Sequence, residues 1–184
     1  DAGSAGWANL PGFLEFIVAP ARTRVLTFVH VSGIGLTYGP LGECEDMRYV
    51  DPERTAAAIE RWRDICVGIK VRQGGFQVGN NHVEPLRRAV EAGDYTNTPV
   101  MVHIAVGVPL PDVLAEMRAG DIVTHCYQGT GDGILSDQGD VLPVARKART
   151  RGVLFDVGHG GGSFRFDIAR AALARDFAAD VIST

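Results

Sequence analysis

The sequence contains no long hydrophobic run, no strong excess of charge of one sign and no paired cysteines. No apolar run approaches the roughly 20 residues that a membrane-spanning helix needs, so no membrane partner is expected. The 184 residues carry a formal net charge of −4, which gives no electrostatic reason to expect nucleic-acid binding. Cys44, Cys66 and Cys126 are widely spaced and form no CxxC pair, which indicates reduced thiols and a cytoplasmic protein.

Lysine is also scarce, because only Lys70 and Lys147 stand among the 18 basic residues. The position of either lysine is therefore more informative than usual. The chain begins with Asp1 rather than methionine, so we expect that the natural N-terminus lies further upstream. Hydrophobic residues make up 46% of the chain, and its length is enough for one sizeable core. We therefore predict a single domain over residues 1–184 that binds a small molecule and could form a homo-oligomer.

Short β-branched runs alternate with longer amphipathic stretches along the chain. This alternation of apolar strands with helices predicts a parallel sheet covered by helices. An open doubly wound sheet and a (β/α)8 barrel both fit the pattern. The strands are expected at Val25–Val31, Val67–Arg72, Val100–Ala105, Ile122–Tyr127, Val153–Val157 and Asp180–Ser183, and the helices at Leu10–Ala19, Pro52–Cys66, Val83–Ala92, Leu110–Ala119, Val141–Arg151 and Phe164–Asp176.

The first six residues, DAGSAG, resemble the tail of a further strand and its loop. The chain would then hold about six and a half βα units, whereas a closed barrel has eight and typically ~250 residues. If the fold is a barrel, we expect it to be incomplete in this chain.

Four polar side chains lie at or near the ends of successive predicted strands: Lys70, His103, His125 and His159. A single histidine on an apolar strand is usually a hydrogen-bonded core residue. Catalytic groups of parallel sheets, however, gather at the carboxyl ends of the strands, so these groups are expected to converge on one cavity. Burying them without partners would be costly, and neutral imidazoles are good ligands for zinc and similar metals.

Lys70 needs a separate explanation, because a protonated ammonium cannot bind a metal. Burial and a nearby cation lower the pKa of a lysine and favour its neutral amine. A neutral amine can add carbon dioxide to give a carbamate, whose two oxygens can bridge two metals. A lysine on a buried strand, followed by histidines on the next two strands, fits such a centre.

The ordered set of GIKVR, VMVHI and THCYQG, together with DAGSAG, DVGHGGGSF and DVIST, resembles the amidohydrolase superfamily. The resemblance is to the dihydroorotase-like amidohydrolase/deacetylase metallohydrolases. It implies a TIM-type (β/α)8 barrel that here lacks its first strand and part of the second and ends at strand 8. It also implies two divalent metal ions, usually zinc. Lys70 would be the carboxylated bridging ligand, His103 and His125 metal ligands, and His159 a substrate-pocket residue.

Two features of that family are missing from the sequence. The His-x-His pair of its first strand does not occur, and the catalytic aspartate that follows a stretch like VIST would come just after Thr184. We therefore expect an internal fragment of an enzyme. The implied reaction is attack of metal-activated hydroxide on an amide, a cyclic amide or an ester, with that aspartate passing a proton to the leaving group.

Other residues allow more than one interpretation. Arg72 could bind a substrate carboxylate, although a salt bridge at the rim is favoured. Gly160, in the loop GHGGGSF, could help to hold a substrate anion or simply make a turn. His30 is expected in the pocket wall or core, and His82 in solvent. Two alternatives also remain: a metal-free enzyme that binds a phosphorylated substrate at Gly158–Gly162, with Lys70 as an ammonium or a Schiff-base lysine, and a non-catalytic remnant.

Overall fold

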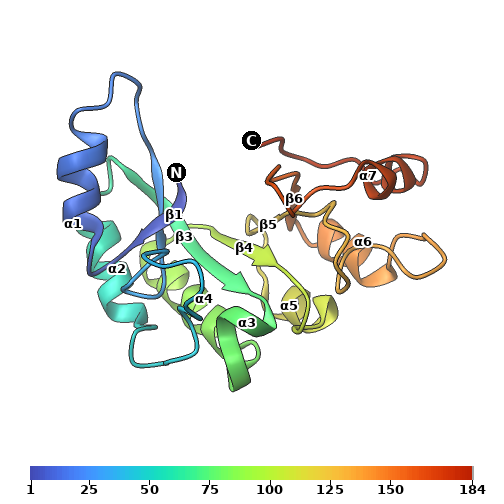
Figure 1. The fold of residues 1–184 in the computed structure, drawn as a ribbon, viewed down its shortest axis with the longest axis horizontal. Coiled ribbons are helices and arrows are strands. Elements are labelled where there is room, and N and C mark those ends of the chain that lie inside the picture. Colours follow the sequence, from blue (N-terminus) through green and yellow to red (C-terminus); the bar gives the residue numbers. More distant parts are fainter. Residues whose placement is uncertain (184) are drawn as a thin grey trace.

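The computed structural model describes residues 1–183, which form one sheet of six parallel strands (Figure 1). Each strand pairs with the next one along the chain. A doubly wound sheet reverses its strand order, whereas a barrel does not, so the observed order identifies a barrel-type sheet. The strands are β1 (Ala2–Gly6), β2 (Thr27–His30), β3 (Cys66–Gln73), β4 (Val100–Ile104), β5 (Ile122–Thr124) and β6 (Leu154–Asp156).

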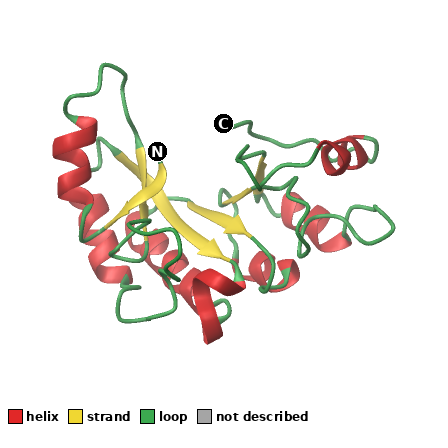
Figure 2. Ribbon diagram, in the orientation of Figure 1, coloured by secondary structure: helices red, strands yellow, loops and turns green. Residues whose placement is uncertain are grey.

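Helices follow the strands and cover one face of the sheet, as Figure 2 shows in red and yellow. The helices are α1 (Leu10–Phe13), continued by the π-helix η1 (Leu14–Val18), α2 (Pro52–Arg61), α3 (Gly75–Val78), the 3-10 turn η2 (Gly79–Asn81), α4 (Glu84–Thr96), α5 (Leu110–Glu116), α6 (Pro143–Thr150) and α7 (Phe166–Leu173). The start of α2 is the one that the sequence predicts. The Asp51 side chain accepts a hydrogen bond from the Arg54 N–H at 2.9 Å, and Pro52 opens the helix.

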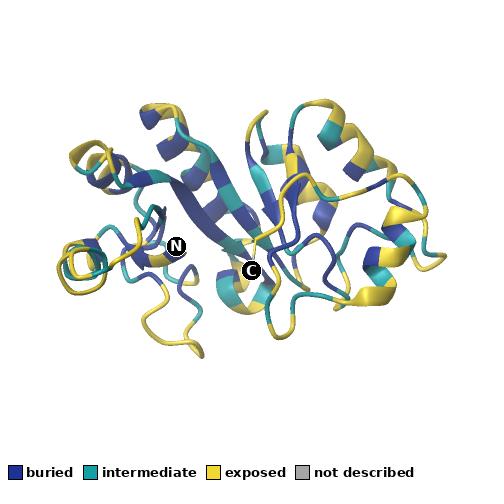
Figure 3. Ribbon diagram, turned by 90° about the horizontal axis from the view of Figure 1, so that it is seen from above, coloured by how far each residue is buried: buried dark blue, intermediate teal, exposed yellow. Residues whose placement is uncertain are grey.

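The core lies between the sheet and the helices, where Figure 3 shows the buried residues concentrated. Helix α2 packs on β2 and β3, and α4 packs on β3 and β4. Strand β3 shows how the two faces differ. Ile69 and Val71 are fully buried core residues, while Lys70 and Arg72 alternate with them and point to the other face. The helix-free face therefore carries the polar groups.

Several boundaries differ from those predicted. The predicted strand Asp180–Ser183 is reduced to a single bridge between Asp156 and Val181. The strand predicted to reach Tyr127 ends at Thr124, and the helix predicted over Phe164–Asp176 is confined to α7. Helix α3 was not predicted, because its four residues are too few to show a period in sequence.

The six strands do not close into a cylinder within the described residues. Strand β1 pairs only with β2 on one side, and on the other side of the sheet only the segment around Val181 borders β6. This confirms the expected incomplete barrel. Residues 1–183 include no helix with the length and apolar character needed to cross a membrane.

Candidate active site

A cavity of about 610 Å³ opens near the carboxyl ends of β3, β4 and β5. It brings together five of the residues singled out from the sequence, which are Lys70, Arg72, His103, His125 and His159. Its other lining residues are Asp1, Ala2, Phe28, Leu36, Met101, Thr124, Gly158 and Ser183. The predicted convergence of the lysine and the histidines is therefore present in the structure.

Lys70 projects from the middle of β3 and is only 4% exposed. Strand β1 makes room for it through Gly3, which has a positive φ of +90°. A Cβ atom at Gly3 would lie 2.2 Å from the Cβ of Lys70. Burial lowers the pKa of Lys70 to about 7, against a partly opposing effect of the Asp156 carboxylate. A large share of this amine is therefore neutral near pH 7.

His103 lies one residue before the end of β4 and sits level with Arg72 on β3 and Thr124 on β5. Its ring meets that of His125 edge to face, with the centroids 4.7 Å apart. Burial, reinforced by His125 and Lys70, lowers the pKa of His103 to about 3. The ring is therefore a neutral imidazole with a lone pair available for a ligand.

His125 follows the last residue of β5 and has a positive φ of 67°, which is rare for a residue with a side chain. Its Nδ1 lies 2.6 Å from the Gly158 carbonyl oxygen. Because a carbonyl only accepts, Nδ1 must carry the proton, which leaves Nε2 as the free acceptor. Burial lowers the pKa of His125 as well, so this ring too is neutral.

The turn at His125 breaks the alternation expected for the predicted strand Ile122–Tyr127. Strict alternation along a strand through Tyr127 would place Thr124 on the face opposite His125. Both side chains line the cavity, because the strand ends at Thr124 and the chain then turns through the positive φ of His125. Cys126 is fully buried in the core.

The chemistry of these side chains fits a divalent metal. Two neutral imidazoles stand in ring contact, and a buried amine with a pKa of about 7 lines the same cavity. Imidazole nitrogens are preferred zinc ligands, and a neutral amine can be converted to an anionic carbamate. Lys70, His103 and His125 could therefore hold such an ion.

A second group of potential ligands, His30, Glu43 and Cys44, also lies close together. Both oxygens of Glu43 are occupied by Arg72, at 2.6 Å from Nε and 2.8 Å from Nη2. A metal would have to displace this guanidinium, and burial raises the pKa of the Cys44 thiol far above its usual range. The group is therefore better described as an ion pair with a neighbouring histidine.

The remaining predicted residues are placed as follows. Arg72 forms the salt bridge that the sequence favours, but with a buried partner rather than at the rim. His159 is exposed and its ring lies 5.2 Å from that of Phe164. Gly160 is in the adjoining loop rather than in the cavity wall. His30 is fully buried and His82 is exposed, both as expected. Thr184, and the aspartate expected after it, lie outside the described residues.

Sequence reasoning missed two buried acids near the cavity. Asp156 accepts hydrogen bonds from Thr124 Oγ1 at 2.7 Å and from the N–H and Oγ of Ser183 at 3.1 and 2.7 Å. Its place in the apolar run VLFDV was a usable signal, since a charged residue at a strand end is the same clue that marked His103. Glu43 lies in an irregular segment without periodicity, so no sequence signal pointed to it.

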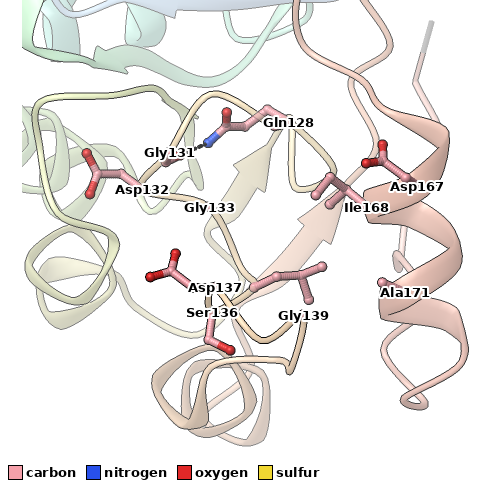
Figure 4. Close-up of a pocket in the computed structure, with 12 residues that line it drawn as sticks. Gln128, Gly131, Asp132, Gly133, Ser136, Asp137, Gly139, Asp167, Ile168 and Ala171 are labelled. Atoms are coloured by element: carbon pink, nitrogen blue, oxygen red, sulfur yellow. Dashed lines mark hydrogen bonds between the residues drawn. The ribbon is translucent and has the colours of Figure 1, made fainter.

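Another cavity, of about 490 Å³, lies between the loop around Gln128–Gly139 and α7 (Figure 4). Several of its polar side chains already have partners within the described protein. The Gln128 amide donates to the Gly131 carbonyl, Asp132 accepts from the Gly107 N–H, and Asp167 pairs with Arg165. This cavity gathers no histidine or lysine, so the first cavity is the candidate active site.

The barrel order of the strands and the cavity with Lys70, His103 and His125 are the features that a resemblance to the amidohydrolases implies. The chain is 36% identical over 187 aligned positions to deacetylases of Agrobacterium fabrum, Brucella anthropi and Enterococcus faecalis. These alignments cover 100% of this chain and 46%, 46% and 50% of the relatives. No family model matches the chain.

Solved structures agree with the sequence relatives. A crystal structure of a dihydroorotase matches with a TM-score of 0.92 and 34% identity, covering 100% of this chain and 48% of the other. A crystal structure of an adenine deaminase matches with a TM-score of 0.92 and 35% identity, covering 100% and 50%. These matches bear out the resemblance to the amidohydrolase superfamily, and the chain spans about half the length of the curated relatives that it matches.

Proposed function

We propose that this chain forms part of a metal-dependent hydrolase that cleaves an amide, a cyclic amide or an ester bond in a small molecule. The observation that carries the proposal is the meeting of two neutral histidine rings, 4.7 Å apart, in one cavity with a buried lysine of lowered pKa. The names of the relatives, deacetylase, dihydroorotase and adenine deaminase, support a hydrolase of this kind.

In this proposal Lys70, His103 and His125 would hold two divalent metal ions, with zinc as the expected metal, and Lys70 would do so as a carbamate. When bound, the metal lowers the pKa of water and polarises a carbonyl group. The protein's own part is to hold the two rings neutral by burial and to fix the tautomer of His125 through the Gly158 carbonyl. The aspartate expected after Thr184 would move the proton to the leaving group.

Substrate contacts are assigned to the open side of the cavity. His159 is exposed there and can stack against or donate to the substrate. Arg72 retains N–H groups beyond the two that Glu43 occupies, and these can donate to a substrate oxygen. Gly160 can contribute its backbone N–H from the adjoining loop. We place this function in one cytoplasmic barrel domain, which could assemble as a homo-oligomer.

Metal analysis of the full-length protein that contains this chain tests the proposal. The purified protein is expected to hold close to two equivalents of a divalent metal, and the Lys70→Ala variant to lose most of it. The matched control is Lys147→Ala, since Lys147 is the other lysine and lies exposed on α6. Carbon-13 NMR after addition of labelled bicarbonate should show a carbamate signal that disappears in Lys70→Ala. Full metal occupancy in Lys70→Ala would rule out the bridging role.

The metal-free alternative, a phosphate site at Gly158–Gly162, has less support in the structure. The His159 N–H already donates to the Ser183 carbonyl at 2.9 Å, and the Ser163 N–H at the end of the loop donates to Gly160 at 3.1 Å. A remnant without activity would lack metal altogether. Metal content close to zero in the wild-type protein would therefore favour one of these two alternatives.

A further inference from the structure

Arg72, which lines the cavity beside His103, forms an ion pair with a buried carboxylate outside the cavity lining. Glu43, only 2% exposed, binds Arg72 through both of its oxygens, at 2.6 Å to Nε and 2.8 Å to Nη2. The Arg72 side chain is 19% exposed and lines the cavity. A bidentate pair of this kind has a fixed geometry, because the guanidinium fork and the carboxylate are both planar. The cavity wall therefore presents an Arg72 guanidinium whose charge is already paired with Glu43.

His30 lies next to Glu43 but adds no charge. Its Nδ1 accepts a hydrogen bond from the Ser32 N–H at 3.0 Å, so its proton is on Nε2, which faces Glu43 Oε1 at 3.3 Å. Complete burial lowers the pKa of His30, so the ring is neutral. The Ser32 hydroxyl further fixes the segment by donating to the Glu43 carbonyl at 2.6 Å. The formal charge of the three side chains is therefore zero.

This arrangement bears directly on which substrates the cavity accepts. A free arginine on a cavity wall attracts carboxylates and phosphates. Here a carboxylate of the protein is already placed against the guanidinium, and it repels a second anion approaching the same group. An uncharged oxygen can still accept a hydrogen bond from the remaining N–H groups of Arg72.

We propose that Glu43 is a specificity-determining residue, which neutralises Arg72 so that the cavity wall favours uncharged groups and disfavours anionic ones beside the reacting bond. This inference rests on the proposed function only in taking the cavity as the place where the substrate binds. Arg72 then acts as a hydrogen-bond donor within a neutral pair and not as a receptor for a substrate carboxylate.

The test compares two probes of matched shape, benzoate and benzamide, by calorimetric titration of the metal-loaded full-length protein. In Glu43→Gln, which leaves Arg72 as an uncompensated cation, the Kd for benzoate is expected to fall by about tenfold or more, with the Kd for benzamide changed by less than about threefold. Glu45→Gln is the matched control, because it removes the same charge from an exposed side chain two residues away and should change neither constant.

The double variant Glu43→Gln with Arg72→Gln removes both charges together and so leaves no unpaired buried ion. It is expected to keep the wild-type ratio of the two dissociation constants within about threefold. It also carries the test if the single variant does not fold. Any attraction of benzoate to the metal is common to all variants and cancels in these comparisons.

Two results would overturn the proposal. One is a Glu43→Gln protein that folds but binds benzoate no more tightly than wild type. The other is a double variant that loses about tenfold or more in benzoate affinity while keeping its affinity for benzamide, since Arg72 would then be an anion receptor despite Glu43. Metal content of the same preparations reports separately on the proposed hydrolase, so the two ideas can fail independently.

Discussion

Lys70 links the chemistry of the cavity to the stability of the fold. Its pKa in the folded chain is about 7, below the ordinary value of 10.5, because burial disfavours the ammonium. Between these values the unfolded chain binds more protons than the folded one, so stability rises with pH; below pH 7 both states are protonated and this slope disappears. We predict that the free energy of unfolding of the metal-free full-length protein, measured by urea titration, increases from pH 7 to 8.5, by at most about 1.4 kcal/mol per pH unit from this group.

The Lys70→Met variant should lose that increase, whereas Lys147→Met should keep it. The upper limit of pH 8.5 matters, because burial raises the pKa values of Cys66 and Cys126 to about 11 and about 12. These thiols stay protonated to a higher pH in the folded chain than in the unfolded one. They therefore reduce the free energy of unfolding as the pH rises above about 8.5. Equal pH slopes for the two variants would show that Lys70 is not the group responsible.

At the scale of single residues, the sequence was informative where a polar group interrupts an apolar strand. Lys70, His103 and His125 are of this kind, and all three line the cavity. Glu43 could not be found in this way, since its position depends on how the irregular segment after β2 folds back over Arg72. That return path is a tertiary contact across 29 residues and has no local sequence pattern.

At the scale of elements, the ends of β5 and β6 depend on one close approach. Gly158 has a positive φ of +52°, and a Cβ atom there would lie 2.1 Å from Thr124 Oγ1 and 2.8 Å from His125 Nδ1. Gly158→Ala is therefore expected to displace the His125 ring and to lower metal affinity by about tenfold or more. A competition titration with a coloured chelator measures this change. In the same loop, a Cβ atom at Gly161 would meet nothing within 4 Å.

Gly161→Ala is the matched control and should bind metal as the wild type does. If both glycine variants kept full affinity, the Gly158–His125 contact would not position the ligand.

The same elements show how far periodicity in the sequence can predict which face a side chain occupies. Alternation separates Lys70 from Ile69 on the long strand β3, but it does not hold at β5, where three residues of strand are followed by the positive φ of His125.

At the scale of the whole molecule, alternating strands and helices predicted a parallel sheet but left the strand order open. Periodicity gives the elements and their faces, whereas order depends on how each helix packs back onto the sheet. The structure settles this, because the six strands lie in chain order with α2 and α4 on the same outer face. Among the described residues, one open border of the sheet is therefore formed by β1 and the other by the segment beside β6.

These borders determine how residues 1–184 should behave when produced alone. Unpaired strand edges offer N–H and C=O groups to other chains, and the segment next to β6 also exposes Ile182, at 79%. We predict that this polypeptide elutes as large assemblies in size-exclusion chromatography and melts without a cooperative transition. Ile182→Lys should raise the soluble fraction, because a charge at an edge opposes strand addition. The full-length protein is the control and should melt cooperatively, whereas a monomeric, cooperatively melting 1–184 polypeptide would show that the open borders do not limit the fold.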